Sequence, residues 1–288
     1  MHELGAKGGM KFNMDQAWSR AIDLVKDSFQ LLLVIAAVFL LLPSIGVYLF
    51  MPDFATLAQP GAEPEQVLAV FQENLATIVL VSGAAMIVQF AGQGAIIAMI
   101  GGKRPTVGEA IATGFRVTPS TLAIFVLYFV LYFVAAIVVA IPLVLIAALV
   151  GQAAGALVGV IAGFPSLFVS VYLAARLSMS LPVLVLEGTL NPFSAMMRSF
   201  KLTHKRQWSI LIFWSILFVV YMVIALLFSS GFGVIAALAG GGTATALILG
   251  FADGLMEIAT SLIICGLAVA IFEQLRGPDE DEVSSVFE

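Results

Sequence analysis

Residues 29–51 read FQLLLVIAAVFLLLPSIGVYLFM, an apolar run without a charged side chain. A helix crosses the hydrocarbon layer of a membrane, which is ~30 Å thick, with about 20 predominantly apolar residues. The run is therefore long enough for one complete crossing, and it predicts a transmembrane helix.

Five further apolar stretches of this kind follow along the chain. Because each is long enough to cross the membrane, we predict an all-α, polytopic membrane protein with six transmembrane helices. A single membrane domain is expected over residues 1–277, followed by an acidic C-terminal tail over 278–288. The predicted spans are about 29–51, 75–100, 121–150, 156–186, 208–228 and 255–275.

The overall composition supports this class and excludes others. Hydrophobic residues make up 61% of the 288 residues and charged residues 11%, whereas a soluble domain carries about 25% charged residues. The net charge of −5 does not suggest a nucleic-acid partner, which would favour basic clusters. The one cysteine, Cys265, excludes an internal disulfide and a multi-cysteine metal site. We expect no catalytic cluster, no cofactor and no metal site.

The basic residues are distributed unevenly between the two ends of the predicted spans. The segments between the second and third, and between the fourth and fifth, spans are basic, whereas the opposite segments 52–74, 151–155 and 229–254 contain no Lys or Arg. Cytoplasmic segments carry the excess of Lys and Arg, so both termini are predicted to be cytoplasmic. The basic residues on this side are Lys7, Lys11, Arg20, Lys26, Lys103, Arg104, Arg116, Arg198, Lys201, Lys205, Arg206 and Arg276.

Three segments on the basic side resemble one another. Each is a short amphipathic stretch that leads into the next span, over residues 14–33, 108–125 and 194–213. The three align without gaps, so that Ala17, Ala110 and Ala195 correspond, as do the small residues Ala21, Gly114 and Ser199. Either the chain contains three copies of one unit, an interfacial helix followed by a transmembrane hairpin, or short loops between spans simply favour basic amphipathic helices.

A few polar residues fall inside or at the edge of the predicted spans. A charge at mid-bilayer costs about 2.5–3.5 kcal/mol on insertion scales, so such groups usually face the bundle interior or an aqueous cavity. Asp253 and Glu257 share one helix face and could form a proton or cation pathway with Arg176. Alternatively, Arg176 reaches toward the headgroups and Asp253 lies in the outer interface. Gln89 and Gln93 line either a substrate path or an ordinary contact between helices.

The segment before the fifth span is basic and contains an aromatic residue. Basic residues near the surface attract anionic lipid headgroups, at about 1 kcal/mol each. The alternative is that they only fix the topology of the chain. The candidate headgroup-binding residues are Arg198, Lys201, Lys205, Arg206 and Trp208.

The stretch from Arg176 to residue 214, RLSMSLPVLVLEGTLNPFSAMMRSFKLTHKRQWSILIFW, resembles the membrane domain of bacterial glycerophosphoryl diester phosphodiesterases and the related YciC-like inner-membrane proteins. The resemblance implies a six-span membrane domain in a bacterial inner membrane. It does not imply phosphodiesterase activity, which belongs to a separate α/β barrel. It depends on Arg176, Pro182, Glu187, Ala195, Ser199, Leu202 and Trp208, and on AIFEQLRG at 270–277.

The sequence favours a non-enzymatic function. We expect a membrane module that binds or organises lipid through anionic headgroups on the cytoplasmic side, or that anchors a membrane or envelope protein partner. The alternative is a small-molecule or ion transporter or channel that uses Arg176 and the Asp253/Glu257 pair.

Overall fold

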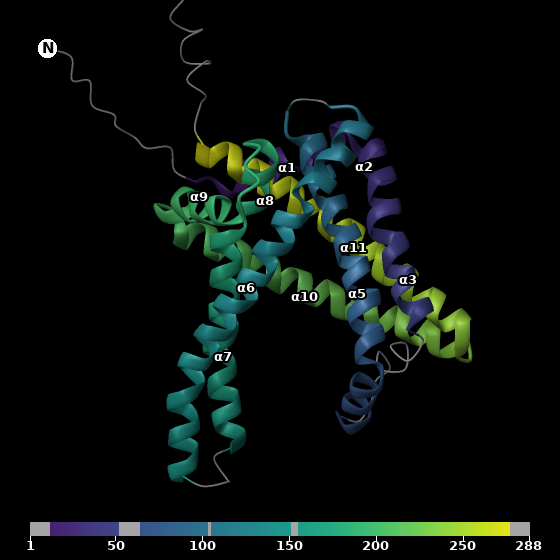
Figure 1. Ribbon diagram of the computed structural model, residues 1–288, viewed down its shortest axis with the longest axis vertical. Helices are drawn as coiled ribbons and strands as arrows, with labels where there is room; N and C mark the ends of the chain where they lie inside the picture. The colour runs from purple at the N-terminus through teal and green to yellow at the C-terminus, as the bar shows by residue number, and fades with distance from the viewer. Residues whose placement is uncertain (1–11, 52–63, 103–104, 151–154, 277–288) are drawn as a thin grey trace, which may run out of the picture.

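The computed structural model describes residues 12–51, 64–102, 105–150 and 155–276, and this part of the chain is entirely helical (Figure 1). The acidic tail over 278–288 and the first part of the segment 52–74 lie outside the described residues. The helices are α1 (Met14–Asp27), α2 (Phe29–Ala36), the π-helical turn η1 (Ala37–Leu41), α3 (Leu42–Phe50), α5 (Pro64–Ile100), α6 (Val107–Val150), α7 (Gly155–Leu177), α8 (Ser180–Leu186), α9 (Pro192–His204), α10 (Gln207–Leu238) and α11 (Gly242–Arg276).

In the described part of the chain, six helical segments are long and apolar enough to cross a membrane, which confirms the predicted fold class. They are Phe29–Phe50, Leu68–Ile100, Val107–Pro142, Gly163–Leu186, Gln207–Leu238 and Gly242–Arg276. The first is continuous through α2, η1 and α3. The fourth is interrupted after Leu177 by a short turn, beyond which α8 begins at Ser180.

Two connections differ from the predicted span boundaries. The stretch 108–125 does not form a separate interfacial helix, because α6 runs without a break from Val107 through Pro119 into the span. The segment 229–254, which lies between the predicted fifth and sixth spans, is mostly helical, because its apolar runs extend α10 to Leu238 and start α11 at Gly242. Gly240, Gly241 and Gly242 all have positive φ angles, a conformation open to glycine, and this allows the tight turn between the two helices.

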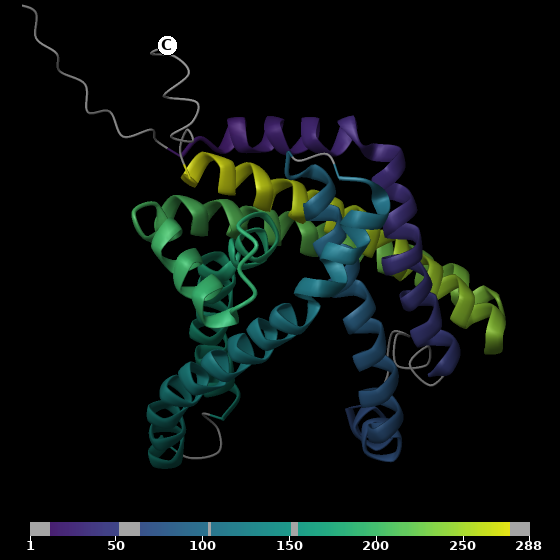
Figure 2. The same ribbon diagram turned by 45° about the horizontal axis from the view of Figure 1, so that its top comes forward.

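The spans form three hairpins that start from a shared end; the second diverges from the others, whereas α3 of the first stays packed on α11 of the third (Figures 1 and 2). The first hairpin consists of α2, η1 and α3 with α5, the second of α6 with α7, and the third of α10 with α11. The helices α1 and α9 and the last turns of α11 lie at the shared end, and α1 runs alongside α11 there (Figure 2). We call this end the basic end, since Arg198, Lys201, Lys205 and Arg276 lie on it.

The helix α11 is the centre of the bundle. In an apolar stretch of 18 residues within α11, 61% of the residues are buried, whereas in the corresponding stretch of α6 none is. Large buried side chains such as Leu32, Ile96, Leu267 and Phe272 pack where the hairpins meet. The diverging parts of the hairpins instead expose Leu, Val and Phe side chains, such as Val130 and Leu226, as expected of surfaces that face lipid.

The three aligned segments occupy equivalent places in the bundle. Ala17, Ala110 and Ala195 are all fully buried. Unit 1 comprises α1 to α5, unit 2 comprises α6 to α8, and unit 3 comprises α9 to α11. Each unit has one small residue at the aligned position, namely Ala21, Gly114 or Ser199. In every case this residue lies against the second hairpin helix of another unit.

These contacts follow a cyclic order. Ala21 of unit 1 packs on α11 of unit 3, where a Cβ atom added at Gly266 would lie 3.2 Å from the Ala21 carbonyl oxygen. Gly114 of unit 2 packs on α5 of unit 1, with its Cα atom 3.0 Å from a Cβ atom added at Gly94. In unit 3 the Ser199 hydroxyl donates a hydrogen bond of 2.6 Å to the Arg176 carbonyl of unit 2. Three copies of one unit around a pseudo-threefold axis predict this order.

Candidate functional site

The start of α9 is fixed by its own sequence. The Asn191 side chain accepts hydrogen bonds from the backbone N–H groups of Phe193 and Ser194, at 3.0 and 3.2 Å, as expected of an N-cap residue. Pro192 occupies the first turn, where its fixed φ angle suits a helix and its missing N–H costs nothing. These residues set the point at which the basic helix begins.

The two sides of α9 differ in chemistry. Ala195, Ser199 and Thr203 are fully buried and follow one another at four-residue intervals, so they form the face that packs on the bundle. Arg198, Lys201 and Lys205 are exposed. The packing of small residues therefore determines which way the basic side chains point.

Four of the five candidate headgroup-binding residues surround one hollow, which we call the α9 hollow. It has a volume of about 330 Å³ and is lined by Arg198, Lys201, Leu202, Lys205, Arg206 and Leu275. Leu275 comes from the last turn of α11, so the hollow lies between the end of α9 and the end of α11, both of which belong to unit 3. Among the described residues its lining contains four basic side chains and no acidic one, so the side chains that the structure places there are positively charged.

A second hollow adjoins the first and shares Arg198 and Lys201 with it. It has a volume of about 520 Å³ and also contacts Glu187 and the exposed apolar side chains of Phe193 and Met197. Arg198 Nε donates to Glu187 Oε1 at 3.2 Å, so part of the Arg198 charge is already neutralised. For Lys201, Lys205 and Arg206 no carboxylate partner is found among the described residues.

Trp208, the fifth candidate, lies in the first turn of α10 and does not line the hollow. Its side chain is 61% exposed. An exposed tryptophan at the end of a membrane span is typical of the interface between headgroups and hydrocarbon.

Arg176 is buried at the end of α7, against α9. Its Nη1 donates to Thr203 Oγ1 at 2.9 Å, and its guanidinium lies 4.8 Å from the centre of the Phe200 ring. No ion pair joins Arg176 to Asp253 or Glu257 in the part of the chain that the structure describes. Arg176 therefore anchors α9 to the preceding unit and does not complete the predicted intramembrane pair.

Part of the predicted polar set does come together on α5 and α11. The Ser261 hydroxyl donates to Glu257 Oε1 at 3.1 Å, and the Gln93 side chain lies close to the same carboxylate. Asp253 is exposed one turn earlier on α11, and Gln89 is half-buried one turn before Gln93. Glu257 thus has neutral neighbours from two helices.

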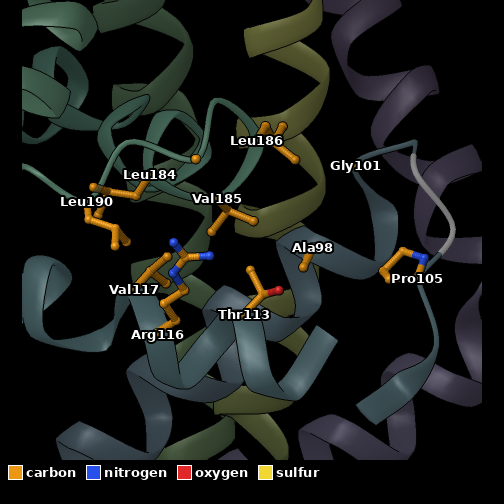
Figure 3. A pocket seen from close by; sticks show the side chains of 11 residues that line it. Ala98, Gly101, Pro105, Thr113, Arg116, Val117, Leu184, Val185, Leu186 and Leu190 are labelled. Atoms are coloured by element: carbon orange, nitrogen blue, oxygen red, sulfur yellow. The ribbon is translucent and has the colours of Figure 1, made fainter. Parts of the chain in front are cut away.

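One feature of the basic end was missed by sequence reasoning. Arg116 served there only as a topology marker, yet in the structure it lines a hollow between α6 and the segment that follows α8 (Figure 3). The two walls are about 70 residues apart in the chain, so no local pattern indicates the hollow. The gapless alignment, which places Arg116 opposite Lys201, was the available signal.

These observations define the chain as an integral, multi-pass helical membrane protein with a basic end. Residues 157–278 match the family model described as the membrane domain of glycerophosphoryl diester phosphodiesterase. Residues 157–278 are therefore similar to this membrane domain, which confirms the resemblance noted for the same region. No curated protein and no solved structure was found to match the chain.

Proposed function

We propose that this protein is a non-catalytic membrane module that binds anionic phospholipid headgroups at the α9 hollow. The observation that carries the proposal is the gathering of Arg198, Lys201, Lys205 and Arg206 around one hollow, which no acidic residue lines in the part of the chain that the structure describes. Four cations this close repel one another, so the arrangement favours a bound anion.

The surroundings of the hollow favour an anion that belongs to a lipid. The chain enters the span at Gln207, directly after Arg206, so the hollow lies at headgroup depth. Leu202 and Leu275 provide apolar lining next to the cations, and Trp208 is exposed beside it. In the proposed topology this end is cytoplasmic, because basic segments stay on that side, and the membrane is the bacterial inner membrane.

The proposal predicts that removing three of the charges abolishes selective lipid retention. The protein and its Lys201→Gln/Lys205→Gln/Arg206→Gln variant are purified from a mixture of phosphatidylethanolamine and phosphatidylglycerol, and the bound lipids are counted by native mass spectrometry. We expect the wild type to retain phosphatidylglycerol preferentially and the variant to lose this preference, because the cations that contact the phosphate are absent.

The matched control is Lys26→Gln, which removes an exposed basic residue of α1 outside the hollow. This variant should retain phosphatidylglycerol as the wild type does. Equal retention by the wild type and the triple variant would contradict the proposal.

Transport is the second candidate function, and the contact of Glu257 with Gln93 and Ser261 favours it. Against it, Arg176, the predicted partner of the Asp253/Glu257 pair, instead donates to Thr203 of α9. In proteoliposomes we expect the wild type and Glu257→Gln to show equal proton and cation leakage, no greater than that of protein-free vesicles. A flux in the wild type that Glu257→Gln abolishes would establish transport instead.

A further inference from the structure

A separate hollow at the basic end contains Arg116. It has a volume of about 240 Å³ and lies between the end of α5, the first turns of α6 and the segment from Leu184 to Leu190 (Figure 3). Most of its lining is apolar or small, as with Ala98, Gly101 and Val117. Arg116 is the only charged residue that lines it among the described residues.

The Arg116 guanidinium is available to a ligand. Figure 3 shows its nitrogen atoms pointing into the space below Val185 and beside Thr113. The described residues provide no carboxylate or carbonyl partner for it. A guanidinium presents several N–H donors in a planar fork that fits the oxygens of a phosphate group. The neighbouring Thr113 hydroxyl donates to the Glu109 carbonyl at 2.8 Å, so Arg116 is the main donor.

The walls of the hollow are held in place. The Ser120 hydroxyl donates to the Leu190 carbonyl and thereby ties the segment after α8 to α6. On the other side, Gly101 at the end of α5 packs so closely on Leu186 that a Cβ atom there would overlap the leucine side chain. The space in front of Arg116 is therefore a formed cavity that exists before a ligand arrives.

The alignment of the repeats relates this hollow to the larger of the two hollows beside α9. A shift of 85 residues, the spacing of Ala110 and Ala195, carries Ala98, Thr113 and Arg116 onto Val183, Arg198 and Lys201. The first three line the Arg116 hollow, and the second three line the larger hollow beside α9. Units 2 and 3 thus place a basic residue at the same position in equivalent cavities.

Unit 1 does not have this arrangement. The spacing of Ala17 and Ala110 places Arg20 and Asp23 at the positions of Thr113 and Arg116. Arg20 Nε is bound to Glu273 Oε2 at 2.9 Å, and an acid replaces the cation. Two of the three units therefore have a cation at this position, whereas in unit 1 Asp23 stands there and the nearby Arg20 is ion-paired.

We propose that the Arg116 hollow is a second binding site for a phosphate group, supplied by either a membrane phospholipid or a free phosphate ion. The inference rests in part on the proposed lipid binding at α9, since the counterpart of the Arg116 hollow in unit 3 is the larger hollow that shares Arg198 and Lys201 with the α9 hollow. It adds a second ligand for each chain and assigns a function to a residue outside the α9 cluster.

The test counts ligands in four forms of the full-length protein: wild type, Arg116→Gln, the triple variant Lys201→Gln/Lys205→Gln/Arg206→Gln, and the combination. One arm titrates phosphatidylglycerol and counts bound lipids by native mass spectrometry. The other titrates inorganic phosphate against chloride at equal ionic strength and follows the thermal midpoint. Size-exclusion profiles verify that each variant is folded, and Arg20→Gln, which changes the ion-paired position, is the matched control.

If the Arg116 ligand is a lipid, Arg116→Gln lowers the number of tightly bound phosphatidylglycerol molecules by one and the combination removes a further one. If the ligand is free phosphate, Arg116→Gln weakens the phosphate response at least tenfold and leaves the lipid count unchanged. Arg20→Gln should match the wild type in both arms.

An Arg116→Gln variant with the wild-type lipid count and phosphate response overturns the inference. If the triple variant loses its lipid in the same experiment, the proposed function stands without the second site. If instead only Arg116→Gln loses a ligand, the proposed function at α9 fails while the Arg116 site stands.

Discussion

Gly114→Ala should sharply destabilise the protein. A Cβ atom at this position would overlap the Ala91 carbonyl oxygen and lie 2.9 Å from the Ala95 nitrogen. Both are backbone atoms of α5, so no side-chain rotation can relieve the clash and the two helices must separate. Overpacking of a core costs typically about 1–3 kcal/mol, and a clash with backbone belongs at the upper end of that range. We expect the thermal midpoint in detergent to fall by roughly 10 °C.

Gly108→Ala is the matched control for this prediction. It lies in the same helix, and an added Cβ atom would meet nothing within 4 Å. Since alanine favours helix over glycine by about 1 kcal/mol, this variant should be as stable as the wild type or more so. A Gly114→Ala protein with the wild-type thermal midpoint would show that α5 and α6 do not cross as described.

Reversing the charges on α9 should give the largest functional effect. In Lys201→Glu/Lys205→Glu/Arg206→Glu, three positive charges are lost and three negative ones are added to the α9 hollow. At about 1 kcal/mol for each basic residue, the loss alone weakens binding of an anionic headgroup roughly 100-fold, and repulsion from the new carboxylates weakens it further. Titration of the detergent-solubilised protein with short-chain phosphatidylglycerol and phosphatidylcholine measures the difference.

Ionic strength provides an internal check on this prediction. The Debye length falls from about 10 Å at 0.1 M salt to about 3 Å at 1 M, so added salt should weaken phosphatidylglycerol binding to the wild type. Lys26→Glu, on α1 outside the hollow, should bind as the wild type does. If the charge-reversed protein still prefers phosphatidylglycerol over phosphatidylcholine, the α9 hollow is not the lipid site.

The six spans could be predicted because the membrane imposes a length and a hydrophobicity on each of them. The ends of the helices could not be predicted, because the hydropathy does not show how far a helix continues past the hydrocarbon layer. Pro119 illustrates this: it would end many helices, yet α6 continues through it. Buried Thr118 and Thr121 donate to the carbonyls of Gly114 and Val117, at 2.8 and 3.0 Å, and packing on α5 holds this part of the helix in place.

The basic cluster on α9 could be predicted as a group because its members are close in the sequence and share an exposed face. The partner of Arg176 could not, since Thr203 and Phe200 belong to the following unit and neither is charged. The same limit applies to Arg116, whose cavity is closed by residues of another helix. Contacts between units determine both the partner of Arg176 and the cavity around Arg116. The sequence indicates such contacts only through the alignment of the repeats.

The most direct test of lipid binding at α9 is an experimental structure of the protein with short-chain phosphatidylglycerol. We predict density for a phosphate group in the α9 hollow, within hydrogen-bonding distance of Lys201, Lys205 and Arg206. An α9 hollow that contains only solvent, in a structure where phosphatidylglycerol is ordered elsewhere on the protein surface, would contradict the account.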